Sequence, residues 1–191
     1  MAGSARYTAV LDANVLYPSV LRDLLISLAV SGLYYARWSE QINLEWTRNL
    51  KVNRPDIAGK VDSIKDLMNS AVPDCLVENY EALIPGLNLP DPDDRHVLAT
   101  AIAGHADAIV TINLKDFPTA VLANYGIKAI HPDEFIANQF EIAPTEVLVT
   151  IKMVRSRMKN PPIVVTEFLE MIRKCDLPQT AQQLERSEKL L

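Results

Sequence analysis

Residues 91–118 read DPDDRHVLATAIAGHADAIVTINLKDFP, and this stretch decides the fold. Small and apolar residues follow the three acids with helical spacing, which predicts a helix over residues 95–106. The strongly hydrophobic run at 106–112 predicts a buried strand, and the NLKDFP after it predicts a loop. A helix that leads directly into such a strand is typical of a parallel sheet covered by helices on both faces.

The same alternation of strands and helices continues on both sides of this stretch. The flanking patterns predict strands at 7–11, 34–37 and 126–131, and helices at 20–28, at 39–50, after Pro55 and from Pro132 to residue 138. From residue 144 on the pattern is wholly helical, and prolines at 161, 162 and 178 separate three helices, the last over 179–191. We therefore expect an α/β domain with a central parallel sheet over residues 1–142 and a helical C-terminal extension over residues 143–191.

The composition excludes disorder and a membrane span. Hydrophobic residues make up 49% of the 191 residues and charged residues 23%, which is typical of a folded globular chain. The longest charge-free apolar stretch near the start, residues 24–36, is too short to cross a bilayer. Asp12 stands where a signal peptide would need an apolar run, so we expect a cytoplasmic protein with no membrane partner.

Charge and metal-binding residue types narrow the chemistry. The net charge is −5, but residues 151–191 carry eight Lys and Arg against five Asp and Glu, so the acids are concentrated in the front part. A negative net charge by itself speaks against a nucleic-acid partner, because contacts with phosphate need Lys and Arg. The two cysteines lie 100 positions apart, and the three histidines show no ligand-like spacing. Any metal ion would therefore have to be held by carboxylates.

Four acids stand where the predicted elements begin or end, namely Asp12, Glu45, Asp94 and Asp116. Ligands of open α/β sheets bind outside the carboxyl ends of the strands, so acids at these places are positioned for chemistry. Mg²⁺ prefers oxygen ligands, and carboxylates crowded together without a cation would repel one another. The pattern therefore indicates a site for a divalent cation. Each acid also has a structural alternative: a turn or cap residue for Asp12 and Asp116, a solvated helix position for Glu45, and helix capping for one of the acids at 91, 93 and 94.

Several pieces of the sequence together resemble a known family. They are VLDANVLYPS at 10–19, LEW at 44–46, the 91–118 stretch and GIKAIHPDEF at 126–135. Over about residues 6–138 they are similar to the PIN domain, in the branch that contains the VapC-type toxins of bacterial toxin–antitoxin pairs. The long 91–118 stretch is the specific part of this resemblance.

The resemblance implies a Rossmann-like α/β/α fold and an endoribonuclease that depends on Mg²⁺ or Mn²⁺, with residues 1–142 as the PIN-like nuclease domain. It implies that Asp12, Asp94 and Asp116 hold the metal ion, and that Glu45 is a further ligand or orients a water molecule. Asp94 fits the family's register better than Asp93, because RHVLATA follows it. An RNA substrate and a cognate antitoxin protein are implied as partners. Further members of the site would be the polar residues Asn14, Thr111 and Asn113 and the acids Asp91 and Asp93.

Two other functions compete with this interpretation. One is a catalytically silent PIN-like module that binds RNA or protein. The other is a phosphohydrolase of the haloacid dehalogenase type, which needs a second Asp two residues after the first, where this chain has Asn14. A stripe in the extension has helical spacing and would serve either an intrachain core or the seam of a homodimer; it consists of Val147, Ile151, Val154 and Met158.

Overall fold

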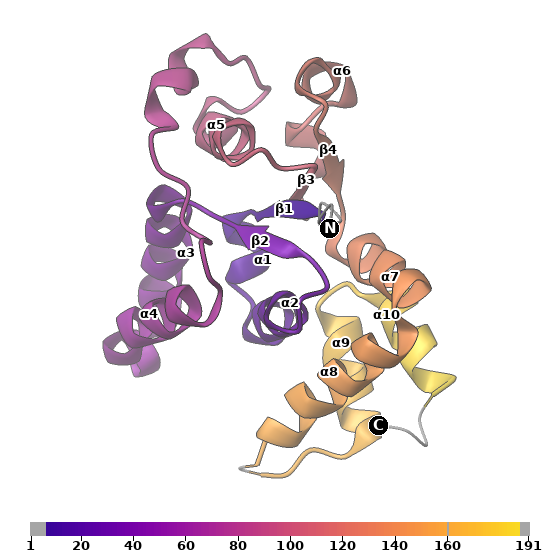
Figure 1. Ribbon diagram of the computed structural model, residues 1–191. Helices are drawn as coiled ribbons and strands as arrows, with labels where there is room; N and C mark the ends of the chain where they lie inside the picture. The colour runs from indigo at the N-terminus through magenta and orange to yellow at the C-terminus, as the bar shows by residue number, and fades with distance from the viewer. Residues whose placement is uncertain (1–6, 160, 188–191) are drawn as a thin grey trace. The chain divides into compact units, whose positions relative to one another are not determined.

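The computed structural model describes residues 7–159 and 161–187, and the chain divides into two units (Figure 1). The first unit combines the chain up to Tyr17 with Tyr34–His131, and the second combines Pro18–Leu33 with the chain from Pro132 on. The division into residues 1–142 and 143–191 stays a prediction, and its two ends, residues 1–6 and 188–191, lie outside the described residues.

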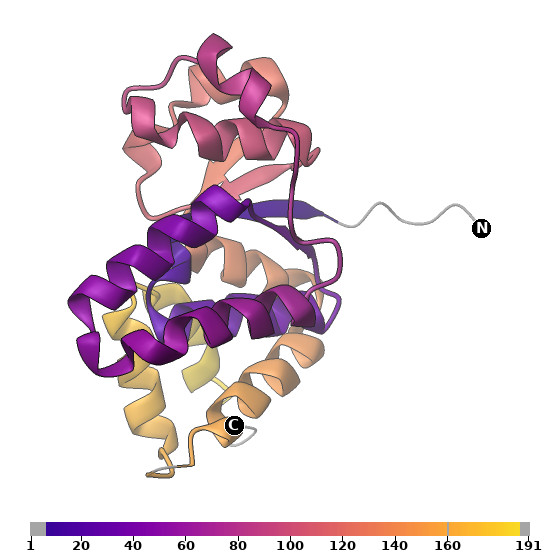
Figure 2. The same ribbon diagram turned by 90° about the vertical axis from the view of Figure 1, so that its left-hand side faces the viewer.

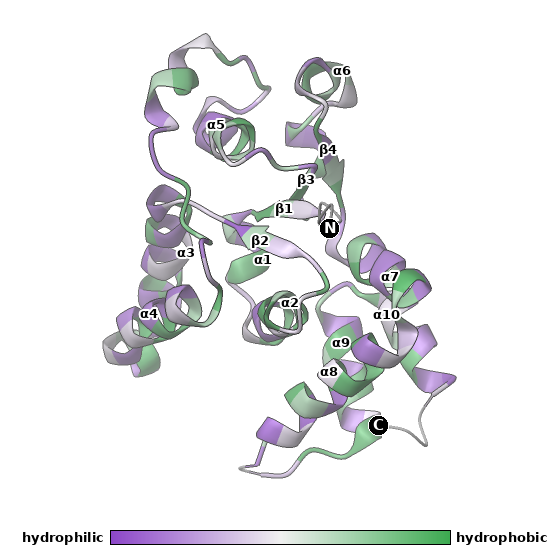
Figure 3. Cartoon of the chain, in the orientation of Figure 1, coloured by the Kyte–Doolittle hydropathy of each residue, from purple (hydrophilic) through white to green (hydrophobic). Residues whose placement is uncertain are grey.

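Four parallel strands form the centre of the first unit, in the order β2-β1-β3-β4. Their bounds are Thr8–Leu11 (β1), Tyr35–Arg37 (β2), Ala108–Val110 (β3) and Lys128–Ile130 (β4). Leu11 lies opposite Val110, and Val110 lies opposite Ile130, so β1, β3 and β4 end at the same edge of the sheet. All three residues of β3 are apolar and buried, and Figure 3 shows this strand in the hydrophobic colour. Such strands suit a sheet covered on both faces, and the predicted α/β class is confirmed.

Helices and 3-10 turns connect the strands of this sheet. They are α1 (Ala13–Leu16), α3 (Glu40–Asn53), α4 (Val61–Ala71), α5 (Arg95–Ala103) and α6 (Thr119–Leu122), with the 3-10 turns η1 (Pro55–Lys60), η2 (Glu81–Gly86), η3 (Pro92–Asp94), η4 (Leu114–Asp116) and η5 (Ala123–Tyr125). α5 packs against β1 and β3, whereas α3 packs against α1 and α4, and Figure 2 shows α3 and α4 side by side. The helix predicted at 39–50 begins as expected, because the Ser39 hydroxyl accepts a hydrogen bond from the Ile42 amide at 3.3 Å.

The turn between α5 and β3 depends on Gly104. A Cβ atom at this position would lie 2.9 Å from Val77 Cγ2 and 3.0 Å from the Thr100 carbonyl oxygen, so the chain comes this close only with glycine. His105 then adopts a left-handed conformation with φ 49°, and the Asp107 amide donates a hydrogen bond to the Thr8 carbonyl at 2.8 Å. The turn therefore ends the helix earlier than the predicted 95–106 and aligns β3 beside β1.

The second unit is helical and contains a helix from early in the chain. Its members are α2 (Ser19–Val30), α7 (Pro132–Ile142), α8 (Pro144–Arg157), α9 (Val165–Lys174) and α10 (Pro178–Glu185). α2 packs against α8 and α9, and α10 packs against α7 and α9. Val147, Ile151 and Val154 are buried within the single chain, so most of the predicted stripe of α8 serves an intrachain core. The homodimer stays a prediction.

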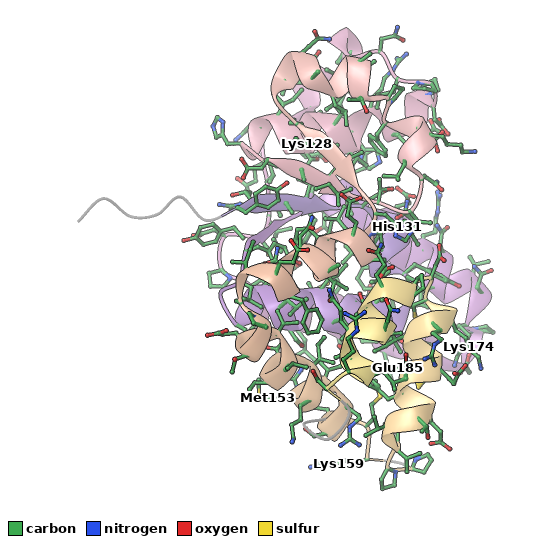
Figure 4. All side chains as sticks on the ribbon, turned by 90° about the vertical axis from the view of Figure 1, so that its right-hand side faces the viewer. Lys128, His131, Met153, Lys159, Lys174 and Glu185 are labelled. Carbon is green, nitrogen blue, oxygen red and sulfur yellow. The ribbon has the colours of Figure 1, made fainter. Side chains whose placement is uncertain are left out.

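Polar contacts join the helices of the second unit. Asp133 of α7 is 2% exposed, and its carboxylate accepts hydrogen bonds from the Gln179 amide, the Thr180 amide and the Thr180 hydroxyl, each at 2.8 Å. These bonds satisfy donors at the start of α10 that the helix itself leaves free. Glu185, labelled at the end of α10 in Figure 4, pairs with Arg173 of α9.

A membrane-crossing helix is absent from the described ranges, because each helix there is too short or too polar to span a bilayer.

Candidate functional site

The end of β1 brings Asp12 to the carboxyl edge of the sheet. Because β1 pairs with β3, Asp12 lies beside Thr111, the residue that follows β3. Asp12 is 4% exposed, and its carboxylate accepts hydrogen bonds from the Ala13 amide at 2.6 Å, the Asn14 side-chain amide at 2.6 Å and the Thr111 hydroxyl at 2.7 Å. The first of these bonds caps α1, so the predicted capping role and a place in the site coexist at this residue.

Asn14 joins the segments that follow β1 and β3 by hydrogen bonds. Its side-chain nitrogen also donates to the Thr111 hydroxyl at 2.9 Å, and its side-chain oxygen accepts from the Ile112 amide at 3.1 Å. The Asn113 amide donates to the Thr111 hydroxyl at 3.1 Å. The segment after β3 is therefore tied to the first turn of α1, and the orientation of the Asp12 carboxylate is set by three neighbours.

The acids before α5 take different roles. Asp91 caps η3, because its carboxylate accepts a hydrogen bond from the Asp93 amide at 2.9 Å. Asp93 is exposed, whereas Asp94 is half-buried at the start of α5. The negative charges of Asp12, Asp91, Asp116 and Glu45 raise the pKa of Asp94. The fold therefore brings the other three predicted site acids within electrostatic range of Asp94.

Glu45 reaches the site from α3, and His96 reaches it from α5. Ile42 and Trp46 are buried on the same helix as Glu45, which leaves the Glu45 carboxylate at the border of the buried face, as predicted. Glu45 Oε2 lies 3.5 Å from Nε2 of His96, whose side chain is 5% exposed. Within the described part of the chain, His96 Nδ1 has no hydrogen-bond partner. The burial of His96 beside Glu45 is not predictable from the sequence, since no local pattern indicates which helix faces another.

An open groove of about 960 Å³ passes over these residues. Glu45, Asp94 and Asp116 line it, together with His96 and Asn113, while the more deeply buried Asp12 is not among its lining residues. Asp116 is half-buried at the end of η4, after β3. One end of the groove therefore carries acids from the segments after β3 and before α5 and from α3.

Burial and mutual repulsion disfavour negative charge at this end. Burial, opposed by the hydrogen bond from Thr111 and reinforced by the charge of Glu45, raises the pKa of Asp12 to about 6. Burial also raises the pKa of Asp94 to about 7, with further contributions from the neighbouring acids. Both carboxyl groups thus ionise far less readily than an ordinary aspartate.

The donor atoms fit a hard divalent cation. They are carboxylate oxygens, and a positive charge among them would relieve the repulsion that raises both pKa values. As the side chains stand, however, no three Asp, Glu, His or Cys residues of the described chain converge closely enough to hold a metal ion. Binding would therefore require side-chain rotation, and Asp94 and Asp116 are half-buried and line the open groove.

A comparison with protein families agrees with this geometry. Residues 8–115, more than half of the chain, match the family described as PIN domain. The chain belongs to the PIN domain family. The PIN match contains Asp12, Glu45 and Asp94, and Asp116 follows directly after its end. Residues 132–186 match a second family, described as VapC50 C-terminal domain, so the resemblance to VapC-type PIN proteins is confirmed.

A curated relative adds to this assignment. "Putative ribonuclease VapC50" of Mycobacterium tuberculosis (strain ATCC 25618 / H37Rv) is 36% identical to this PIN protein over 107 residues. The aligned part covers 56% of this chain and 62% of the relative. None of the solved structures matches the chain significantly.

Proposed function

We propose that this chain is a metal-dependent endoribonuclease and the toxin of a toxin–antitoxin pair. Membership of the PIN domain family and the name of the M. tuberculosis relative support a ribonuclease. The observation that supports the metal dependence is the gathering of four acids from separate elements, in which Asp12, Glu45 and Asp116 lie within electrostatic range of Asp94. Their mutual repulsion, added to burial, disfavours negative charge at Asp12 and Asp94. A site of this kind is completed by a cation.

In this proposal Asp12, Asp94 and Asp116 hold Mg²⁺ or Mn²⁺. When bound, the ion would lower the pKa of a water molecule and stabilise negative charge on the phosphodiester. Asn14 and Thr111 fix the Asp12 carboxylate by direct hydrogen bonds, so this ligand needs little reorganisation. Glu45 lines the groove beside His96 and acts as a further ligand or orients the attacking water.

The partners in this proposal are an RNA substrate and a cognate antitoxin protein, with the cytoplasm as the place of action. The match to the VapC50 C-terminal domain supports the antitoxin. A small protein encoded beside this chain should co-purify with it and suppress RNA cleavage. Cleavage that continues at the same rate in the co-purified complex would contradict the toxin–antitoxin part of the proposal.

The direct test is cleavage of total RNA by the purified full chain in Mg²⁺, in Mn²⁺ and in EDTA. Wild type should give discrete fragments that need the metal ion. Asp12→Asn and Asp94→Asn should each lower the rate at least about 100-fold, because a bound cation contributes several kcal/mol to such a step. Circular dichroism should show that both variants remain folded.

Asp93→Asn is the matched control, since it removes the same charge from the exposed neighbour of Asp94, and Asp93 is not among the acids whose charges act on Asp94. It should keep most of the activity. If Asp93→Asn is inactive and Asp94→Asn is active, the assignment within the acidic triplet is wrong. If wild type and all variants behave alike while RNA is still bound, the chain is a catalytically silent binding module.

A further inference from the structure

The groove extends beyond the acids along one face of α3. Gln41, Leu44, Glu45, Arg48 and Val52 line this part, at the spacing of residues on a single helix face. Leu44 is 59% exposed and Val52 is 73% exposed. The face therefore presents apolar surface to solvent next to the candidate metal site.

Arg48 is the cation of this face that is available to a ligand. It is exposed one helical turn after Glu45, and it takes part in no ion pair with any residue that the structure describes. The neighbouring Lys51 is already engaged, because its ammonium group donates to both carboxylate oxygens of Asp62, at 2.8 and 2.9 Å. Positive charge in the groove is thus concentrated at Arg48, beyond the acidic end.

We propose that an unpaired RNA strand lies along the α3 face of this groove, with Arg48 bound to a phosphate near the cleaved bond. This inference rests on the proposed ribonuclease function. The distribution of charge in the groove determines where each phosphate lies. The scissile phosphate occupies the acidic end, where a divalent cation is needed, and a neighbouring phosphate binds Arg48. Leu44 and Val52 contact ribose and base surfaces.

The exposed apolar side chains favour a single strand over a duplex. A double helix presents mainly phosphates and sugars to a protein, and its bases are stacked inside. An unpaired strand can turn base faces toward Leu44 and Val52 while its phosphates remain available to Arg48. The residues that line the groove include no Phe, Tyr or Trp, and the ring of His96 is only 5% exposed. Base contacts are therefore apolar rather than stacked on a ring, and little sequence preference is expected from them.

The test measures binding of a fluorescein-labelled unpaired RNA to the full chain by anisotropy, in Mg²⁺ and at several salt concentrations. The Asp12→Asn background prevents cleavage during the measurement. Arg48→Gln should weaken binding several-fold and reduce the slope of log Kd against log salt by about 0.7, the value for one phosphate contact on a single strand. Arg48→Lys should restore the slope. Leu44→Ser should weaken binding and leave the slope unchanged.

Lys128→Gln is the matched control. Lys128, labelled in Figure 4, is an exposed lysine at the amino end of β4, whereas Asp12 and Asp116 follow the carboxyl ends of β1 and β3. This variant should bind as the background does. The inference is overturned if Arg48→Gln leaves both affinity and slope unchanged, or if a duplex of the same sequence binds as tightly as the single strand. Cleavage by wild type separates the two proposals. If wild type cleaves RNA but Arg48→Gln binds RNA unchanged, the ribonuclease proposal stands and the proposed position of the strand is wrong. If the chain neither binds nor cleaves RNA, both proposals are wrong.

Discussion

At the scale of single residues, the acidic site opposes folding in the absence of a cation. Asp12 accepts three hydrogen bonds, which favour its ionised form, yet burial raises its pKa to about 6. Asp94 is less buried but has more acids around it, and its pKa rises to about 7. In both cases the folded state favours the neutral acid, so ionisation at neutral pH destabilises the metal-free protein.

Asp94→Asn should therefore stabilise the metal-free protein in a pH-dependent manner. The pKa of Asp94 is raised in the folded state, so between its ordinary value of 3.8 and about 7 the folded state holds a proton that the unfolded state releases. The free energy of unfolding of wild type consequently falls as pH rises through this range and is level above it. In EDTA, the Tm advantage of Asp94→Asn should be absent near pH 3.5, grow up to about pH 7 and then stay constant. Asp93→Asn, with the same charge change at an exposed position, should show a smaller and flatter effect. An advantage of Asp94→Asn that shrinks with rising pH would contradict the assignment.

Mn²⁺ should stabilise wild type through the same residues. A ligand that binds only the folded state adds about 2.7 kcal/mol when its free concentration is about 100 times its dissociation constant. For a chain of this length that amounts to a Tm increase of roughly 5–10 °C. Asp12→Asn and Asp116→Asn should lose most of the increase, and Asp93→Asn should keep it. Equal increases in all four proteins would show that the ion binds elsewhere.

At the scale of elements, the sequence predicts most of what local patterns control. The strands at 7–11 and 106–112 and the Ser39 cap are present, because apolar runs and capping side chains act on their immediate neighbours. The gathering of acids at the site can also be predicted from the sequence, since acids that follow parallel strands lie at one edge of the sheet. The contact between His96 and Glu45 cannot be predicted, because it depends on how two helices face each other. The helix predicted at 95–106 ends earlier, at Ala103, because Gly104 forms its C-cap and His105 adopts a left-handed conformation.

Gly104→Ala should test how tightly this turn is built. The new Cβ would meet Val77 Cγ2 at 2.9 Å and the Thr100 carbonyl oxygen at 3.0 Å, so the side chain of Val77 or the backbone at Thr100 would have to shift. We expect a loss of about 1–3 kcal/mol, as for other overpacked sites, measured by urea unfolding. Gly59→Ala is the control, because a Cβ there meets no atom within 4 Å. Unchanged stability in Gly104→Ala would mean that the turn relaxes freely.

At the scale of the whole molecule, the division into units is what the sequence could not show. The apolar stripe of α2 predicts that one face of this helix is buried, but it does not indicate which helices cover that face. In the structure α2 packs against α8 and α9, which lie more than a hundred residues later in the chain. Elements adjacent in sequence usually pack together, and this helix departs from that tendency.

A chain cut after residue 142 should therefore fold poorly. The cut removes α8 and α9, which pack against α2, and so uncovers part of the buried apolar face of α2. Each leucine that becomes exposed costs about 1.5–3 kcal/mol, against a typical total stability of about 5–15 kcal/mol. We expect aggregation or a broad, non-cooperative thermal transition, measured by light scattering and circular dichroism. A chain cut after residue 187, which keeps α8, α9 and α10, is the control. A monomeric 1–142 chain with a sharp transition would contradict the expectation.

The early position of α2 also affects how the chain is made. The ribosome releases α2 long before it has synthesised α8 and α9, about 120 residues later. At about 5–20 residues per second, the apolar face of α2 waits roughly 6–25 s for its partners. During this interval the apolar face of α2 lacks the helices that bury it in the folded second unit.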